Sequence, residues 1–147
     1  MADIVSPEVR SRMMSRIRGR DTKAEVALRK ALFARGFRCR VNDRRLPGSP
    51  DIVFPKHRAV VLVHGCYWHR HQGCSKAYTP KSRVAFWKTK FDENVKRDAR
   101  NVRELRASGW RVAIVWECAI GTKPTHALVD RVEDFLRSDE ETLELPD

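Results

Sequence analysis

The chain has 147 residues and a formal net charge of +11, from 30 basic and 19 acidic side chains. This length fits one domain with a sizeable hydrophobic core and leaves no room for a second. No apolar run is long enough to cross a bilayer and no signal peptide is recognisable, so we expect a cytoplasmic protein without a membrane partner. In such a reducing compartment the four cysteines are not expected to form disulfides.

Positive charge is concentrated away from the C-terminus. Residues 138–147 hold five acids and no base, so residues 1–137 carry a net charge of +16. We predict a polyanionic partner for residues 1–137, which form a single domain, and a mobile acidic tail for residues 138–147. A merely soluble basic surface is the alternative. One short N-terminal segment is well suited to phosphate contacts because five arginines crowd it: Arg10, Arg12, Arg16, Arg18 and Arg20.

Helix and strand signals follow one another along the chain. A proline-led cap predicts a first helix from residue 6 to Gly19, and a capping box at residues 22–25 opens a second helix that ends at Gly36. Short apolar segments predict strands at residues 37–41, 51–54 and 59–63. A long amphipathic helix (84–105), a strand (111–116) and a final helix (125–136) follow. We expect an α/β fold whose mixed sheet sets the last strand beside the third, with active groups at the strand ends.

Residues 63–74, VHGCYWHRHQGC, concentrate side chains that bind metals. Cys66, His71 and Cys74 stand at spacings around which a tetrahedral zinc can close. Cys118, which follows the strand at residues 111–116, can supply a fourth thiolate. The alternatives are ordinary buried thiols or a disulfide, with the histidines as polar surface groups.

A second set of chemical groups lies near the strand ends. Asp51 follows a proline at the start of one strand, while His64 and His69 follow the end of the next. A carboxylate and two imidazoles brought together can hold hydrated magnesium and move protons at a phosphate. The strand at residues 59–63 carries no second acid and no lysine, so we expect the backbone carbonyl of Val63 to help bind the metal. A turn residue is the alternative for Asp51.

Several of these motifs together resemble the bacterial very-short-patch-repair mismatch endonucleases. The resemblance spans residues 6–118 and depends on Pro50-Asp51, His64-Gly65-Cys66-Tyr67-Trp68-His69, Phe86-Trp87, Asn94-Val95-x-Arg97-Asp98 and the stretch from Gly109 to Cys118. It implies a restriction-endonuclease-like, three-layer α/β fold with a central mixed sheet and a structural zinc. It also implies magnesium-dependent nicking of one DNA strand beside a T:G mismatch left by deaminated 5-methylcytosine.

The resemblance also implies roles for individual residues. Asp51 would bind magnesium, His64 and His69 would be catalytic, and Glu25 and Asp98 would be supporting acids. The zinc ligands would be Cys66, His71, Cys74 and Cys118. A wedge entering the DNA stack would comprise Tyr67, Trp68 and Trp87, with Met13 or Met14 approaching from the other groove. Independently of the resemblance, we expect Arg16 and Arg18 of the N-terminal arginine cluster to bind DNA phosphates.

Structural explanations compete with three of these roles. Glu25 can be the capping-box acid, Asp98 can pair with an arginine on its own helix, and Trp87 can be a core residue at helical spacing from Phe91. The favoured function is hydrolysis of a phosphodiester in mismatched duplex DNA by a monomer. The rivals are a non-enzymatic zinc module that binds nucleic acid, and a related nuclease with another lesion specificity.

Overall fold

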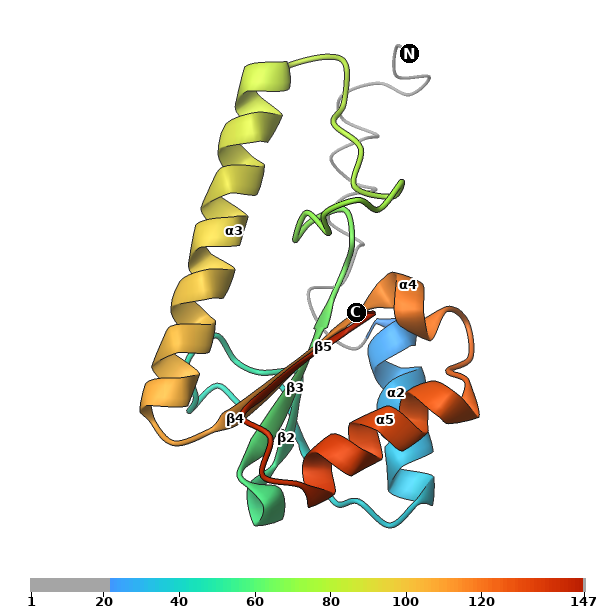
Figure 1. Cartoon of the computed structure of the whole chain (residues 1–147). Helices are drawn as coiled ribbons and strands as arrows, with labels where there is room; N and C mark the ends of the chain where they lie inside the picture. The colour runs from blue at the N-terminus through green and yellow to red at the C-terminus, as the bar shows by residue number, and fades with distance from the viewer. Residues whose placement is uncertain (1–21, 147) are drawn as a thin grey trace.

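The fold is taken from a computed structural model of the chain, which describes residues 22–146 (Figure 1). Capping and apolar periodicity give three of the four described helices where the sequence predicts them, whereas the short helix at Glu117–Ile120 was not predicted. Thr22 accepts a hydrogen bond from the backbone N–H of Glu25 at the start of the first described helix. The helices are α2 (Lys23–Ala34), α3 (Val84–Ala107), α4 (Glu117–Ile120) and α5 (His126–Arg137), with a 3-10 turn η1 at Pro55–His57. The strands are β1 (Arg40–Val41), β2 (Ile52–Phe54), β3 (Ala59–His64), β4 (Arg111–Trp116) and β5 (Thr142–Leu145).

The five strands form one mixed sheet in the order β1-β2-β3-β4-β5. Strands β1, β2 and β3 are antiparallel neighbours, whereas β3, β4 and β5 run parallel to one another. The sequence predicts that the strand at residues 111–116 lies beside the strand at residues 59–63. This pairing of β4 with β3 is confirmed, with Ala59 opposite Arg111 and His64 opposite Trp116. The strand expected at residues 37–41 is shorter, because only Arg40 and Val41 pair with β2.

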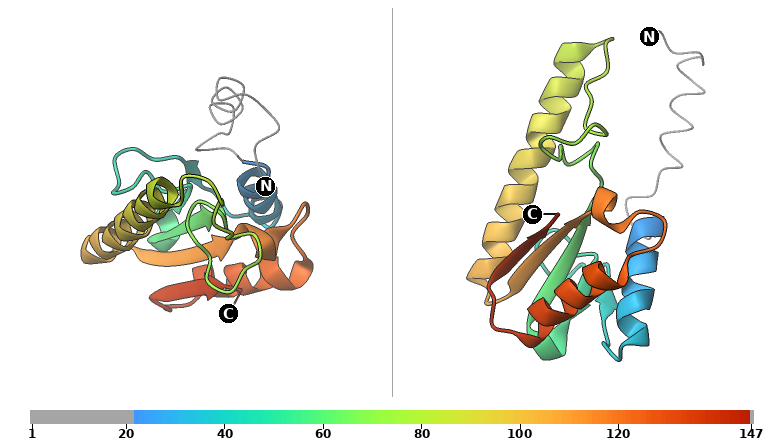
Figure 2. Two further views of the ribbon diagram at one scale, coloured as in Figure 1. Left: turned by 90° about the horizontal axis from the view of Figure 1, so that it is seen from above. Right: turned by 45° about the vertical axis from the view of Figure 1, so that its right-hand side comes forward.

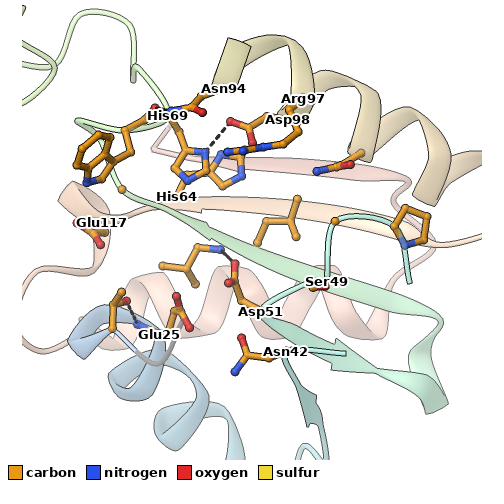
Figure 3. Close-up of a pocket in the computed structure, with 18 of the residues that line it drawn as sticks. Glu25, Asn42, Ser49, Asp51, His64, His69, Asn94, Arg97, Asp98 and Glu117 are labelled. Atoms are coloured by element: carbon orange, nitrogen blue, oxygen red, sulfur yellow. Dashed lines mark hydrogen bonds and ion pairs between the residues drawn. The ribbon is translucent and has the colours of Figure 1, made fainter. Parts of the chain in front are cut away.

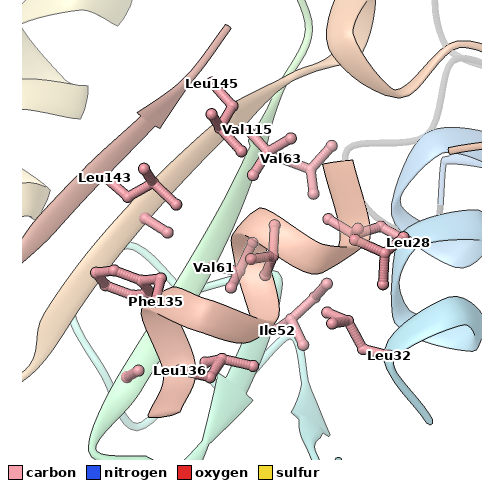
Figure 4. Close-up of a cluster of buried hydrophobic side chains, with 14 of the residues drawn as sticks. Leu28, Leu32, Ile52, Val61, Val63, Val115, Phe135, Leu136, Leu143 and Leu145 are labelled. Atoms are coloured by element: carbon pink, nitrogen blue, oxygen red, sulfur yellow. The ribbon is translucent and has the colours of Figure 1, made fainter. Parts of the chain in front are cut away.

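Helices cover both faces of this sheet (Figure 2). Alternate strand residues such as Val61 and Val115 pack with α2 and α5 on one face, in the larger apolar cluster (Figure 4). Residues of opposite parity, including Val60 and Val112, pack against Leu105 of α3 on the other face. The arrangement is a mixed α/β sheet between helical layers.

Helix α3 is much longer than the strands it covers. Its 24 residues span about 36 Å, whereas a six-residue strand spans about 20 Å. The N-terminal half of α3 therefore projects beyond the carboxyl ends of β3 and β4 (Figure 1). This overhang forms one wall of the site described below. None of the helices among residues 22–146 is long and apolar enough to cross a membrane.

The prediction of a mobile acidic tail at residues 138–147 is wrong for its central part. Residues 142–145 form β5, and the side chains of Leu143 and Leu145 are buried in the larger cluster. The alternation Thr-Leu-Glu-Leu is a half-buried strand pattern that the surrounding acids obscured. The sheet thus extends past residue 137. The first helix predicted for residues 6–19 lies outside the described residues.

Candidate functional site

A cleft of about 1170 Å³ opens at one edge of the sheet. The parallel strands β3 and β4 end at this edge, and antiparallel β2 begins there, so Asp51 lies beside the carboxyl end of β3. The loop at residues 42–49 and the overhanging part of α3 line the cleft as well (Figure 3). Four of the predicted catalytic residues line it with Asp51: Glu25, His64, His69 and Asp98.

Asp51 and Glu25 form a pair of facing acids. Glu25 is only 3% exposed although it also fills the third position of the α2 cap. Burial, the charge of Glu25 and a hydrogen bond with Glu25 raise the pKa of Asp51 from 3.8 to about 7, opposed by the bond from Val63. The backbone N–H of Val63 donates to Oδ2 of Asp51 at 2.7 Å. Two acids that cannot both ionise cheaply are typical of a cation site.

Val63 lines the same cleft, and the strand register bears on the role predicted for its backbone carbonyl. The backbone N–H and C=O of one strand residue point toward the same neighbouring strand. The N–H of Val63 points toward β2, so its carbonyl is expected to point toward β2 as well. In the antiparallel register of β2 and β3, Ile52 lies opposite Val61 and Phe54 opposite Ala59. Continuing this register by two residues places Pro50 opposite Val63. Proline has no N–H, so the ladder offers this carbonyl no donor. The Pro50-Asp51 dipeptide therefore supplies a carboxylate and leaves a carbonyl oxygen beside it for a hard cation.

His64, His69 and Asp98 form a second cluster on the α3 side of the cleft. Nδ1 of His69 lies 2.5 Å from Oδ2 of Asp98. Because a carboxylate can only accept, Nδ1 carries the proton, and in the neutral ring Nε2 is then the acceptor. Burial first, and then the nearby His69, lower the pKa of His64 to about 3, which keeps this imidazole neutral. The bond from His69 shows that Asp98 faces the cleft, not a neighbouring arginine on its own helix.

The stacking of the two imidazoles argues against a metal held by this second cluster. Their ring centroids are 4.1 Å apart and their planes differ by 5°. An imidazole nitrogen binds a metal in the plane of its ring, and two nearly parallel, stacked planes do not meet at the bonding distance. Although the three side chains lie close enough for a shared ion, the ring geometry fits proton transfer better than ligation.

The predicted zinc ligands converge on one point. Their ligand atoms all lie within 4.8 Å of one another: Cys66, His71, Cys74 and Cys118. Nδ1 of His71 is 3.6 Å from Sγ of Cys66 and 3.4 Å from Sγ of Cys118. Zn–S and Zn–N bonds in a tetrahedral site require a sulfur to nitrogen separation of about 3.5 Å. The donor set and its spacing fit zinc, and all four cysteines are free thiols.

The thiols of Cys66 and Cys74 differ in their pKa values. Burial raises the pKa of Cys66 to about 12, whereas a hydrogen bond from the backbone of Lys76 lowers the pKa of Cys74. A buried thiol with a high pKa loses its proton when a cation takes its place. Zinc binding at this cluster would therefore be coupled to loss of the proton of Cys66.

The predicted wedge residues form one partly exposed aromatic cluster above Phe91. Trp68 lies between Tyr67, at a centroid distance of 4.9 Å, and Trp87, at 6.1 Å, while Trp87 stacks on Phe91 at 5.8 Å. Trp87 thus contacts the buried Phe91 and is itself partly exposed, which is compatible with both interpretations of this residue. The buried amide of Asn94 donates to the backbone carbonyl of Trp68 and positions this turn.

Several cleft residues were assigned no role from the sequence. Asn94 and Arg97 were quoted only as part of a motif, and Lys90, Asn101 and Arg44 were not singled out. Lys90, Asn94, Arg97 and Asn101 recur at helical spacing on α3 and line the cleft, and Arg44 lines it from the opposite loop. Their 4-3-4 spacing was the available signal. Glu117, in the first turn of α4, has its carboxyl group 3.6 Å from where a Cβ on Gly65 would lie. The predicted contacts of Met13, Met14, Arg16 and Arg18 lie outside the described residues.

Comparisons with known proteins identify the relatives of this chain. A family model described as DNA mismatch endonuclease Vsr matches residues 2–76. The Type II nicking enzyme V.XorIIP of Xanthomonas oryzae pv. oryzae is 47% identical over 120 residues, covering 82% of this chain and 88% of that protein. V.NmeAIP, a Type II nicking enzyme of Neisseria meningitidis, is 46% identical over 123 residues, covering 84% and 87%. The DNA mismatch endonuclease Vsr of Escherichia coli is 41% identical over 139 residues, covering 92% and 88%.

Proposed function

Because the chain belongs to the Vsr family of DNA mismatch endonucleases, we propose that it nicks one strand of duplex DNA beside a T:G mismatch in very short patch repair. The observation that carries the proposal is the cleft itself, where a buried pair of acids lies across from a histidine held by an aspartate. The mixed sheet between helical layers, with Asp51 at a strand start, supports a restriction-endonuclease-like fold. We also propose that the active form is a monomer.

Asp51 and the carbonyl oxygen of Val63 are the proposed magnesium ligands. Both are hard oxygen donors, and Glu25 adds negative charge beside them. When bound, magnesium would neutralise developing charge on the scissile phosphate and acidify a water molecule. The positive side chains Lys90, Arg97 and Arg44 around the cleft would hold the flanking phosphates.

His69 is the proposed general base. Asp98 fixes its orientation and its tautomer, so Nε2 can accept the proton of a water molecule that attacks the phosphorus in line with the leaving oxygen. His64, kept neutral by burial, supports the ring of His69 by stacking and can donate a hydrogen bond to the phosphate. This assignment makes His69 the base, a choice that the sequence left open.

The aromatic cluster is the proposed mismatch sensor. Inserting Tyr67, Trp68 and Trp87 between base pairs costs a few kcal/mol per opened step, and least where pairing is already weak. The cluster borders the cleft through Tyr67 and Trp68, so a wedge would enter the duplex close to the scissile phosphate. This proximity supports a cut beside the lesion.

A nicking assay tests the proposal. Matched duplexes carrying T:G, U:G or a fully paired site are incubated with the zinc-loaded protein, with and without magnesium. We expect magnesium-dependent cleavage of one strand, fastest on the T:G duplex, and none from Asp51→Asn, which should still bind the mismatch. Equal cleavage of paired DNA would refute the mismatch specificity, and nicking by a folded Asp51→Asn protein would refute the role of Asp51.

A further inference from the structure

Trp116 connects the zinc cluster to the catalytic histidines. At the end of β4 its indole ring stacks on His71, with centroids 4.4 Å apart and planes 10° apart. The same indole meets His64 edge to face at 5.1 Å, and His64 in turn stacks on His69 at 4.1 Å. A continuous array of four rings therefore runs from a zinc ligand to the proposed base.

Glu144 fixes the orientation of this array. Trp116 is only 8% exposed, so its indole N–H requires a partner within the protein. Nε1 of Trp116 donates to Oε2 of Glu144 at 3.0 Å, from the neighbouring strand β5. In the register of β4 and β5, Glu144 pairs with Ile114, two residues before Trp116 and on the same face of the sheet.

We propose that Glu144 and Trp116 are positioning residues that orient the zinc ligand His71 and the stacked pair of His64 and His69 together. The inference rests on the proposed function for its catalytic half. It gives the C-terminal strand a role in nicking and makes the geometry of the zinc site a determinant of the catalytic rate. Removal of a residue that orients a metal ligand typically costs 10–100-fold in metal affinity or activity.

The matched variants are Glu144→Ala, which removes the acceptor, Glu144→Gln, which keeps one, and Trp116→Phe, which keeps a ring without the N–H. Thr142→Val is the control, because Thr142 lies on β5 with the same outward parity and is likewise exposed. Each protein is loaded with cobalt in place of zinc, and its thiolate-to-cobalt absorption and d–d bands are recorded without DNA. The zinc release rate to a chelator and the kcat, KM and pH profile of nicking are then measured.

We expect Glu144→Ala and Trp116→Phe to shift the cobalt spectrum, to speed zinc release and to lower kcat by roughly tenfold with KM unchanged. Glu144→Gln should restore all three properties, and Thr142→Val should alter none. A folded Glu144→Ala protein with an unchanged cobalt spectrum and zinc release would overturn the proposal, as would a loss confined to thermal stability. The spectrum and zinc release need no substrate, so they decide the inference on His71 even if the wild-type protein nicks no duplex.

Discussion

Asp51→Asn should stabilise the protein in magnesium-free buffer while abolishing its activity. The pKa of Asp51 is raised from 3.8 to about 7, so the folded state binds a proton that the unfolded chain releases between these values. The favourable contribution is fully present below pH 3.8 and is lost as pH rises through 7. Asparagine avoids this loss, and its side chain can still accept from Val63 and donate to Glu25.

The magnitude follows from the shift. At 1.36 kcal/mol for each pKa unit, the ionised carboxylate destabilises the folded protein at pH 8 on the order of 2–4 kcal/mol. For a chain of this size, that corresponds to a rise of roughly 5–10 °C in the melting temperature of Asp51→Asn. Burial of neutral His64, whose pKa falls to about 3, has the opposite pH dependence between about pH 3 and 6.5. It acts equally on both proteins and cancels in their difference.

The measurement is denaturant unfolding of wild type and Asp51→Asn at pH 4 and pH 8, with the zinc content verified. The stability difference should be small at pH 4 and large at pH 8, and magnesium at pH 8 should stabilise the wild type alone. Asp139→Asn, a change at an exposed acid, is the control and should show no pH-dependent difference. A pH-independent difference, or a less stable Asp51→Asn at pH 8, would refute the reasoning.

Three further predictions concern other parts of the site. Removal of zinc should unfold at least residues 66–74, because a structural zinc contributes on the order of 10 kcal/mol; elemental analysis finding no zinc in protein purified without chelator would contradict it. Trp68→Ala should fold and bind DNA but lose roughly 1–3 kcal/mol of mismatch preference in competition binding. The control Phe33→Ala, which removes an exposed ring far from the cleft, should keep its mismatch preference. Pro50→Ala should supply an N–H to the carbonyl of Val63 and weaken magnesium binding several-fold in a magnesium titration of the melting temperature; unchanged affinity would remove Val63 from the ligand set.

Most of the described fold was accessible from the sequence because local signals and tertiary packing agree there. The capping box at Thr22, the apolar period of residues 84–105 and the buried run at residues 111–116 each correspond to an observed element. The strand β5 was missed because four alternating residues among acids give a weak local signal. Its stability comes from pairing with β4 and from burial of Leu143 and Leu145, which no local pattern specifies.

The candidate site divides in the same way. Residues close in sequence, such as Cys66 and His71, do lie together. Asp51 and His64, at adjacent strand ends, line the same cleft, although His64 belongs to a separate cluster with His69 and Asp98. The contact between Trp116 and Glu144 was not predicted, because it depends on the position of a strand that had not been recognised. The sequence shows Pro50, which has no N–H, but the register that sets it opposite Val63 is tertiary information.

The composition of the cleft also accounts for a cut in one strand only. The strands of a duplex run in opposite directions, so cutting both at once requires two hydrolytic centres related by a two-fold axis. Residues 22–146 contribute one pair of facing acids, Asp51 with Glu25, and one histidine oriented by an aspartate, His69 with Asp98. Tyr67 and Trp68 of the aromatic cluster line the same cleft. If they insert at the mismatch as proposed, the single centre would meet one strand only, and nicking would follow from the asymmetry of the cleft.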